Sequence, residues 1–329
     1  MVIPHLRTVV QRLPAALRGV AEYHFGWVDE HGRAFDLAGS RDSGGGKMVR
    51  PVLALLSAEV VGGYACDALP AAAAVELTHN FSLIHDDVMD GDRTRRHRAT
   101  VWSVFGIPAA VLAGDALWTL ALQVLCESSP ASGEAMGMLC AAMQAIVRGQ
   151  SADTNFECRD EVGLPECVAM AADKTGALIG CACALGALYG GGNPAQIDRL
   201  RRFGEHLGLA FQLVDDLLGI WGDPTTTGKP AGSDLANRKK SLPVVAALHS
   251  RTSAGDELAS LYRLDRPLTA AELVRAAILV EASGGRRWAR SQADRHAASA
   301  LRLLNNTATH PPTATALTAV AHLITHRNH

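Results

Sequence analysis

Two long apolar segments, each ending in a pair of aspartates, constrain most strongly what this chain can fold into. The first runs from about Asp67 to Asp86-Asp87. The second runs from about Ala195 to Asp215-Asp216. Both are rich in Ala and Leu, which favour helix, and Pro70 suits the first turn of the first segment. Aromatic residues make up only 5% of the 329 residues, so Ala, Leu and Val must build the core. We therefore predict an all-α fold.

The carboxylates that end the first segment have the spacing of a metal site. On a helix, Asp86 and Asp90 lie four residues apart on one face, and Asp87 is rotated about 100° away. Like charges on one face repel each other, so a divalent cation is a natural partner for them. Oxygen ligands without a nearby Cys favour Mg²⁺, which takes one or two carboxylates and leaves its other positions to water and phosphate oxygens. A charged helix end that runs into a solvated loop is the alternative.

Basic residues follow both aspartate pairs. They are Arg93, Arg95, Arg96 and Arg98 after the first pair, and Lys229, Lys239 and Lys240 after the second. Guanidinium groups match phosphate oxygens in geometry and charge. A solvated surface does not readily explain two apolar helices that each end in Asp-Asp and continue into a basic loop. The repeated pattern therefore predicts a substrate that carries phosphate.

From about Gly44 to Pro243 the sequence resembles the trans-isoprenyl diphosphate synthases, the short-chain group of the polyprenyl synthetase family. The likeness rests on three stretches: Gly46-Lys47-Met48-Val49-Arg50-Pro51, His79 to Arg96, and Phe211 to Gly219. Nearly every segment of the chain has a helical pattern. We expect a single domain over residues 1–329, a helical bundle with a central active-site cavity between facing helices. Residues 1–40 would form an N-terminal helical segment, and residues 244–329 would form packing helices.

The resemblance implies a role for each site residue. Isopentenyl diphosphate would be held by Lys47, Arg50, His79 and Arg96. The allylic diphosphate would be bound by Arg95, Lys174, Thr175, Gln212, Lys229 and Lys239. Asp86, Asp90 and Asp215 would bind Mg²⁺, with three ions per site. Of these residues, Asp86, Asp90, Arg95, Lys174, Asp215 and Lys229 would be catalytic. Gln150 and Asp153 could also face the cavity.

The implied reaction is a prenyl transfer. Ionisation of an allylic diphosphate separates pyrophosphate from a carbocation, and preorganised cations lower that barrier, each contributing roughly 10²–10³ in rate. Apolar walls keep water from the carbocation. Isopentenyl diphosphate then presents its double bond, and the departing pyrophosphate accepts the proton that is lost.

Product length depends on the depth of the apolar pocket below the first aspartate pair. Phe81 lies five residues before Asp86, and Ser82 lies four before it, with no residue inserted between Asp86 and Asp90. This combination resembles the synthases that make geranylgeranyl diphosphate (C20). We predict a C20 product, with farnesyl diphosphate (C15) as the alternative.

Two positions depart from the family pattern. Gly219 stands where the second motif usually has a third aspartate, and Ala99 replaces the usual proline after the arginine pair. One metal ligand, or one group that supports a ligand, is therefore absent. Whether Asp223 compensates is left open by the sequence. Neither departure removes a residue that the reaction strictly requires.

Three other functions compete with this one. A terpene cyclase on the same fold would not need the pocket of Lys47, Arg50, His79 and Arg96. A non-catalytic regulatory subunit would be free to lose its aspartates, yet five of the usual six are present. A metal phosphohydrolase built on His85-Asp86-Asp87 would need further His ligands that are not apparent.

Charge and cysteine content indicate the compartment and partners. The formal net charge of −2 gives no global attraction to nucleic acid or anionic membrane. Seven scattered cysteines without a Cys-x-x-Cys pair fit reduced, buried thiols in a cytoplasmic protein.

Residues 1–20 lack a signal peptide, and the uncharged run 175–197, which a glycine cluster interrupts, fits a core helix. We expect no transmembrane segment. The resemblance implies a homodimer, and Arg286, Arg287 and Arg290 are interpreted as a solvated face.

Overall fold

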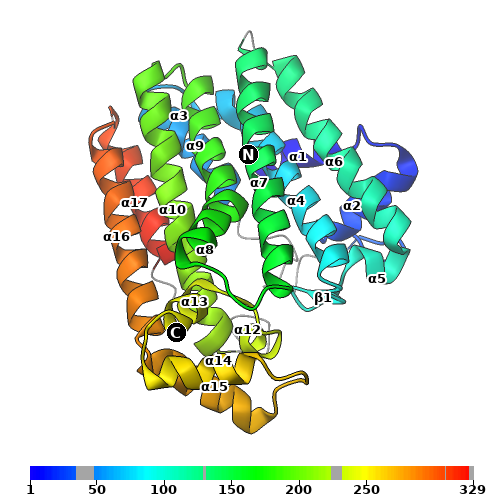
Figure 1. Cartoon of the computed structure of the whole chain (residues 1–329). Helices are drawn as coiled ribbons and strands as arrows, with labels where there is room; N and C mark the ends of the chain where they lie inside the picture. Colours follow the sequence, from blue (N-terminus) through cyan, green and yellow to red (C-terminus); the bar gives the residue numbers. More distant parts are fainter. Residues whose placement is uncertain (35–47, 129–130, 224–231, 308, 326–329) are drawn as a thin grey trace. The chain divides into compact units, whose positions relative to one another are not determined.

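The computed structural model describes residues 1–34, 48–128, 131–223, 232–307 and 309–325 (Figure 1). The prediction of an all-α protein is confirmed, because the strands of the described residues are two residues long. Lys47 and Lys229 lie outside the described residues. The same is true of the glycines that precede Lys47.

The helices follow the apolar segments of the sequence. In the first half of the chain they are α1 (Val2–Val10), α2 (Ala15–His24), α3 (Val49–Val60), a 3₁₀ turn η1 (Ala65–Ala68), α4 (Leu69–Met89), α5 (Val101–Phe105), α6 (Ile107–Ser128) and α7 (Ser132–Glu157). In the second half they are α8 (Leu164–Ala171), a π-helical turn η2 (Ala172–Gly176), α9 (Ala177–Tyr189), α10 (Pro194–Trp221), α12 (Ser233–Ala236), α13 (Leu242–Leu248), α14 (Ser253–Tyr262), α15 (Ala270–Ala282), α16 (Gly285–Asn305) and α17 (Pro311–Thr325). Two short antiparallel strands, β1 (Thr94–Arg95) and β2 (Arg98–Ala99), form a hairpin after α4.

The described chain divides into two compact units. The first contains residues 1–141, 181–201 and 307–317, and the second contains 142–180, 202–306 and 318–329. Both units are discontinuous in sequence, because α7, α10 and α17 each contribute residues to both. The prediction of a single domain with a central cavity stays a prediction.

The first unit is built around α4 and α6, which pack along each other (Figure 1). Pro70 stands in the first turn of α4, as the sequence predicts. Residues 71–75 of this helix, four alanines and a valine, are fully buried. Small side chains let neighbouring helices approach α4 closely, so the apolar run becomes the core of this unit.

The second unit has its core on α10 and the helices that follow it. Leu213, Val214 and Leu217 of α10 are buried together with Leu242 of α13 and Ala293 of α16. A second cluster joins α13, α14 and α15. The buried apolar positions of α10 recur at helical spacing, and Asp215 between them is exposed.

One glycine in the second unit marks a close helix contact. A Cβ atom on Gly149 of α7 would lie 2.5 Å from the backbone nitrogen of Lys174. The close approach therefore requires a residue without a Cβ atom at this position of α7. The partner segment is the π-helical turn η2, an irregularity that is frequent at functional sites.

The cysteines and the apolar helices differ in part from the predictions. All seven cysteines are free, but Cys66, Cys126, Cys140 and Cys158 are exposed, so the prediction of buried thiols is wrong for these four. They lie at positions that face solvent, and for Cys126 and Cys140 these positions belong to segments that are apolar in sequence. Two helical stretches, residues 107–128 and 164–189, are long and apolar enough to span a membrane, with 44% and 67% of their windows buried. Core helices meet the same criterion, so this finding is weak evidence for a membrane span.

Candidate active site

The first aspartate pair lies at the end of α4. Asp87 is 1% exposed, whereas Asp86 is partly exposed and Asp90, the C-cap residue, is exposed. The helix therefore directs Asp86 and Asp90 toward one accessible side, as their spacing predicts. Asp87 is directed inward and has a different role.

Asp87 holds the arginine hairpin against the end of α4. Arg95 Nε donates a hydrogen bond to Asp87 Oδ1 over 2.7 Å. Burial raises the pKa of Asp87 to about 6, although the charge of Arg95 and its hydrogen bond act in the opposite direction. Arg95, predicted to neutralise a diphosphate, is thus positioned by a buried carboxylate that the sequence analysis did not include in the site.

The hairpin turn places Arg96 at its tip. Arg96 and His97 have φ values of 50° and 61°, in the left-handed region. Positive φ at both central residues is the requirement of a type I′ hairpin turn, which joins β1 to β2. Arg96 is exposed on this turn.

Arg50, His79 and Arg96 act on one another electrostatically, as the resemblance implies. Burial lowers the pKa of Arg50 to about 10, and Arg96 adds to the effect while Glu76 opposes it. Burial also holds the pKa of His79 well below its usual value, and the charges of Arg50 and Arg96 lower it further. His79 is therefore a neutral imidazole beside two guanidinium groups. The sequence correctly brings these three residues together.

The floor of this basic cluster contains polar residues that the sequence analysis missed. Glu76 is 5% exposed, and burial raises its pKa. Asn80 Nδ2 donates to Glu76 Oε1 over 2.9 Å, and its Oδ1 lies 3.1 Å from His24 Nε2. Glu76 lies three residues before His79 and four before Asn80 on the same helix, so helical spacing was the available signal.

Arg50 has an unsatisfied polar atom. Its Nε is buried and makes no hydrogen bond to any of the described residues. A buried donor without a partner costs free energy, because it has lost water and gained nothing in exchange. An anion that accepts from this guanidinium would remove that cost. The donor set thus fits a bound phosphate.

The residues predicted to limit product length lie on the buried side of α4. Phe81 is 9% exposed, and its ring packs edge-on against His85 with 4.6 Å between centroids. Trp118 of α6 lies 6.1 Å from Phe81, so a second aromatic residue extends this wall. Ser82 donates its hydroxyl to the carbonyl oxygen of His79 over 2.8 Å. Trp118 was missed because sequence alone does not say which residues of α6 face α4.

The second aspartate pair lies near the end of α10 and repeats the arrangement of the first. Asp215 is exposed, whereas Asp216 is 4% exposed. Asp216 accepts hydrogen bonds from Gln212 Nε2 over 2.7 Å and from the backbone N–H of Leu242 over 2.9 Å. Burial raises the pKa of Asp216 to about 7, and the charge of Lys239 acts in the opposite direction. Asp216 thus ties α10 to the first turn of α13.

Two of the cations predicted to bind the allylic diphosphate, Lys174 and Lys239, interact with carboxylates of the second unit. Lys174 Nζ lies 2.6 Å from Asp153 Oδ2, with both side chains mostly buried. The carboxylates of Asp216, Asp234, Asp153 and Asp215 together raise the pKa of Lys239 above its usual value, although burial opposes them. Asp153, which the sequence marks only as able to face the cavity, is therefore the ion-pair partner of Lys174.

Gln212 is already engaged by neighbouring residues. Thr175 Oγ1 donates to Gln212 Oε1 over 2.6 Å, and Gln212 Nε2 donates to Asp216. The resemblance implies that Gln212 and Thr175 contact the substrate. In the structure they connect η2 to α10 and fix the orientation of Asp216.

The carboxylates fit Mg²⁺ that is shared with a substrate. Among the described residues, no group of three or more His, Cys, Asp or Glu is arranged to hold a metal ion by itself. Mg²⁺ typically uses one or two carboxylates and completes its octahedron with water and phosphate oxygens. Asp86 with Asp90, and Asp215 in the second unit, are donor sets of this kind.

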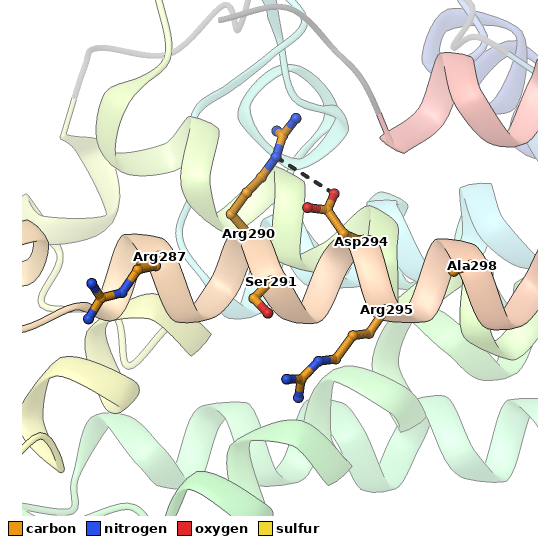
Figure 2. Close-up of a pocket in the computed structure, with 6 residues that line it drawn as sticks. All are labelled: Arg287, Arg290, Ser291, Asp294, Arg295 and Ala298. Atoms are coloured by element: carbon orange, nitrogen blue, oxygen red, sulfur yellow. Dashed lines mark ion pairs between the residues drawn. The ribbon is translucent and has the colours of Figure 1, made fainter.

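A separate surface groove lies on α16 (Figure 2). It is lined by Arg287, Arg290, Ser291, Asp294, Arg295 and Ala298. Arg290 Nε lies 3.8 Å from Asp294 Oδ1, a long contact between side chains that remain substantially exposed. No residue of the predicted active site lines this groove. Its composition agrees with the interpretation of these arginines as a solvated face.

Comparisons with known proteins identify the family. The family model described as polyprenyl synthetase matches residues 40–279. The (2E,6E)-farnesyl diphosphate synthase of Mycobacterium tuberculosis is 44% identical over 99% of this chain and 90% of that protein. The geranylgeranyl diphosphate synthase of the same organism is 44% identical over 98% of this chain and 90% of that protein. The crystal structure of a polyprenyl synthetase from Streptomyces coelicolor A3(2) superposes with a TM-score of 0.91 at 44% identity, over 98% of this chain and 96% of that one.

These matches extend along nearly the whole chain and include both aspartate pairs, the arginine hairpin and Arg50. The relatives are short-chain prenyltransferases by name, and the all-α fold is shared with the solved structure. The chain belongs to the polyprenyl synthetase family and is a prenyltransferase of isoprenoid biosynthesis.

Proposed function

We propose that the protein condenses isopentenyl diphosphate with allylic diphosphates to make all-trans geranylgeranyl diphosphate. The observation that carries this proposal is the shared arrangement of the two aspartate pairs. In each pair the second carboxylate is buried and bonded within the fold, and the first is accessible at a helix end. Two accessible carboxylate sites, each next to basic residues, suit a substrate with two phosphate groups.

The metal requirement follows from the donors. Asp86, Asp90 and Asp215 would hold Mg²⁺, with three ions per site, and Mg²⁺ supplies charge neutralisation for the departing pyrophosphate. Lys174 and Lys239 contribute fixed positive charge in the second unit, together with Lys229. Because Lys174 and Lys239 are held by neighbouring carboxylates of the second unit, they need little reorganisation when charge develops on the leaving group.

Arg50, His79 and Arg96, with Lys47, form the pocket for isopentenyl diphosphate. The unsatisfied Nε of Arg50 supplies a donor without a competing partner among the described residues. Neutral His79 donates one ring N–H without adding a charge. The pyrophosphate released from the allylic substrate accepts the proton that the new product loses, so these residues need only bind and orient.

Product length is the finer part of the proposal. The two mycobacterial relatives are equally identical to this chain and carry names for C15 and C20 products. Small Ser82, next to Phe81, leaves room that a second aromatic residue at that position would close. We therefore favour C20 and keep C15 as the second candidate.

Compartment and assembly complete the proposal. We place the protein in the cytoplasm as a homodimer, without a transmembrane segment or a nucleic-acid partner. A terpene cyclase or a regulatory subunit on this fold would have no use for the cluster of Arg50, His79 and Arg96.

One experiment separates these functions. The protein is incubated with labelled isopentenyl diphosphate and with C5, C10 or C15 allylic diphosphate, with and without Mg²⁺, and the products are separated by chain length. The proposal expects labelled C20 from each starter with Mg²⁺. A chain that ends at C15 would favour the second candidate. Products without label would indicate a cyclase.

A further inference from the structure

Gly219 of α10 faces a carboxylate from another segment of the second unit. A Cβ atom on Gly219 would lie 2.4 Å from Oδ2, 2.6 Å from Cγ and 2.9 Å from Oδ1 of Asp234. Real Cβ atoms do not approach other atoms so closely. The position at which the family pattern has a third aspartate is therefore filled by the carboxylate of Asp234.

The helix places this carboxylate on the side of α10 that carries Asp215. Gly219 lies four residues after Asp215, and residues at this spacing share a helix face, about 5.4 Å apart along the axis. Asp234 stands in the first turn of α12, which begins after Gly232 in the left-handed region with a φ of 75°. This turn brings α12 onto α10 one helical turn beyond Asp215.

Asp234 also acts electrostatically on the other groups of this half-site. Its charge contributes to the raised pKa of Asp216, behind the larger effect of burial. It contributes likewise to the raised pKa of Lys239, together with Asp216, Asp153 and Asp215. Asp234 therefore lies within interaction distance of Asp216 and of Lys239, the cation on which Asp215 also acts.

We propose that Asp234 supplies the carboxylate that the second motif lacks, so that Gly219 and Asp234 together replace the third aspartate. This inference rests on the proposed function, because it assigns Asp234 to the Mg²⁺ that Asp215 would hold. Asp223, the other candidate for compensation, follows the end of α10 by two residues. Gly219 is required in this arrangement, because any side chain there would displace Asp234.

A reciprocal exchange tests the inference. Asp234→Asn removes the charge and keeps the size of the side chain. Gly219→Asp adds a carboxylate that collides with Asp234, and the double variant Gly219→Asp with Asp234→Ala moves the carboxylate to α10. Gly219→Ala with Asp234→Ala is the matched control without a carboxylate, and Asp215→Asn is the reference for loss of a metal ligand.

The readout is the Mg²⁺ concentration at half-maximal thermal stabilisation, measured on the full chain with inorganic pyrophosphate present and without turnover. We expect Asp234→Asn to raise this concentration about tenfold, as loss of a group in or next to a metal site commonly does. The double variant with aspartate on α10 should return it to within about threefold of the wild-type value. The control without a carboxylate should stay at the value of the Asp234→Asn variant, and Gly219→Asp alone should lower the melting temperature.

The outcomes separate the inference from the proposed function. If Asp215→Asn raises the midpoint and Asp234→Asn leaves it unchanged, the inference is overturned and the metal site stands. If Asp215→Asn also leaves it unchanged, the metal site itself is wrong. If the double variant does not fold, Asp234→Asn alone decides. Recovery by the control without a carboxylate would show that Asp234 acts only by filling space.

Discussion

Arg95 Nε donates to the buried Oδ1 of Asp87 over 2.7 Å, and this bond fixes the arginine hairpin to the end of α4. Asp216 has the corresponding place in the second motif, where it accepts the backbone N–H of Leu242. In both motifs the second aspartate is bonded to the segment that follows, and the first is the one that we propose as a metal ligand. Neighbouring carboxylates in one motif therefore have separable roles.

The first prediction uses this separation. Asp87→Asn should lower the melting temperature, because Arg95 then loses its ion pair with the buried Asp87 carboxylate. It should leave the Mg²⁺ concentration at half-maximal stabilisation nearly unchanged. Asp86→Asn should raise the Mg²⁺ concentration at half-maximal stabilisation and change the melting temperature without Mg²⁺ less than Asp87→Asn does, since the Asp86 side chain is more accessible. Thermal melts of both variants over a Mg²⁺ titration measure the difference, and equal effects on the Mg²⁺ midpoint would contradict it.

Much of the site could be predicted from the sequence because helical spacing is regular. The four-residue interval between Asp86 and Asp90 fixes a shared face before any fold is known. The positions of Arg50, His79 and Arg96 came from the family pattern, and the structure brings them together. Where a pattern lies within one helix or one hairpin, local geometry is sufficient.

The missed residues depend on contacts between segments. Asp153 reaches Lys174 across 21 residues, and Trp118 reaches Phe81 because α6 packs along α4. Asp234 fills the space above Gly219 from a segment 15 positions later in the chain. No periodicity encodes such contacts. Exposure of cysteines was also misjudged, because one side of a helix can be apolar in sequence and still face solvent.

The second prediction concerns Arg50. Arg50→Lys keeps a positive charge but loses the guanidinium donors, so the KM for isopentenyl diphosphate should rise about tenfold, the equivalent of one charged hydrogen bond. The KM for the allylic diphosphate should change little, because we propose Arg50 for the isopentenyl diphosphate pocket alone. Arg93→Lys, at an exposed arginine over the Trp102 ring, is the control. Equal increases in both KM values would contradict separate pockets.

The third prediction concerns pH. Burial lowers the pKa of His24 from 6.5 to about 3, with Arg96 and Arg95 as further causes. Between these pH values the unfolded chain binds a proton that the folded chain does not, so the stabilising contribution of His24 is fully present above pH 6.5 and is lost as pH falls toward 3. The slope is about 1.4 kcal/mol per pH unit for one such group.

His24→Gln should flatten this dependence, because Gln cannot be protonated and can still donate to Asn80. Urea unfolding at several pH values between 7 and 4.5 gives the free energy of unfolding for wild type and variant. His31→Gln, at an exposed position, should retain the wild-type slope. An unchanged slope in His24→Gln would show that another group controls the acid sensitivity.

The fourth prediction concerns the aromatic wall. Phe81→Ala should lengthen the product beyond C20, because it opens the pocket below Asp86, and Trp118→Ala should act in the same direction. Each truncation also costs roughly 3–5 kcal/mol of stability, so turnover is assayed well below the melting temperature of the variant. Phe105→Ala is the control, since Phe105 packs on Tyr23 instead. Unchanged product length in both wall variants would place the floor elsewhere.

The most direct test of the central claim is turnover of labelled isopentenyl diphosphate by a variant in which Asp86→Asn and Asp215→Asn are combined. The account predicts that wild type elongates an allylic diphosphate to C20 only with Mg²⁺, and that the double variant folds but loses nearly all elongation. Undiminished elongation by the folded double variant would contradict a metal-assisted reaction that depends on Asp86 and Asp215.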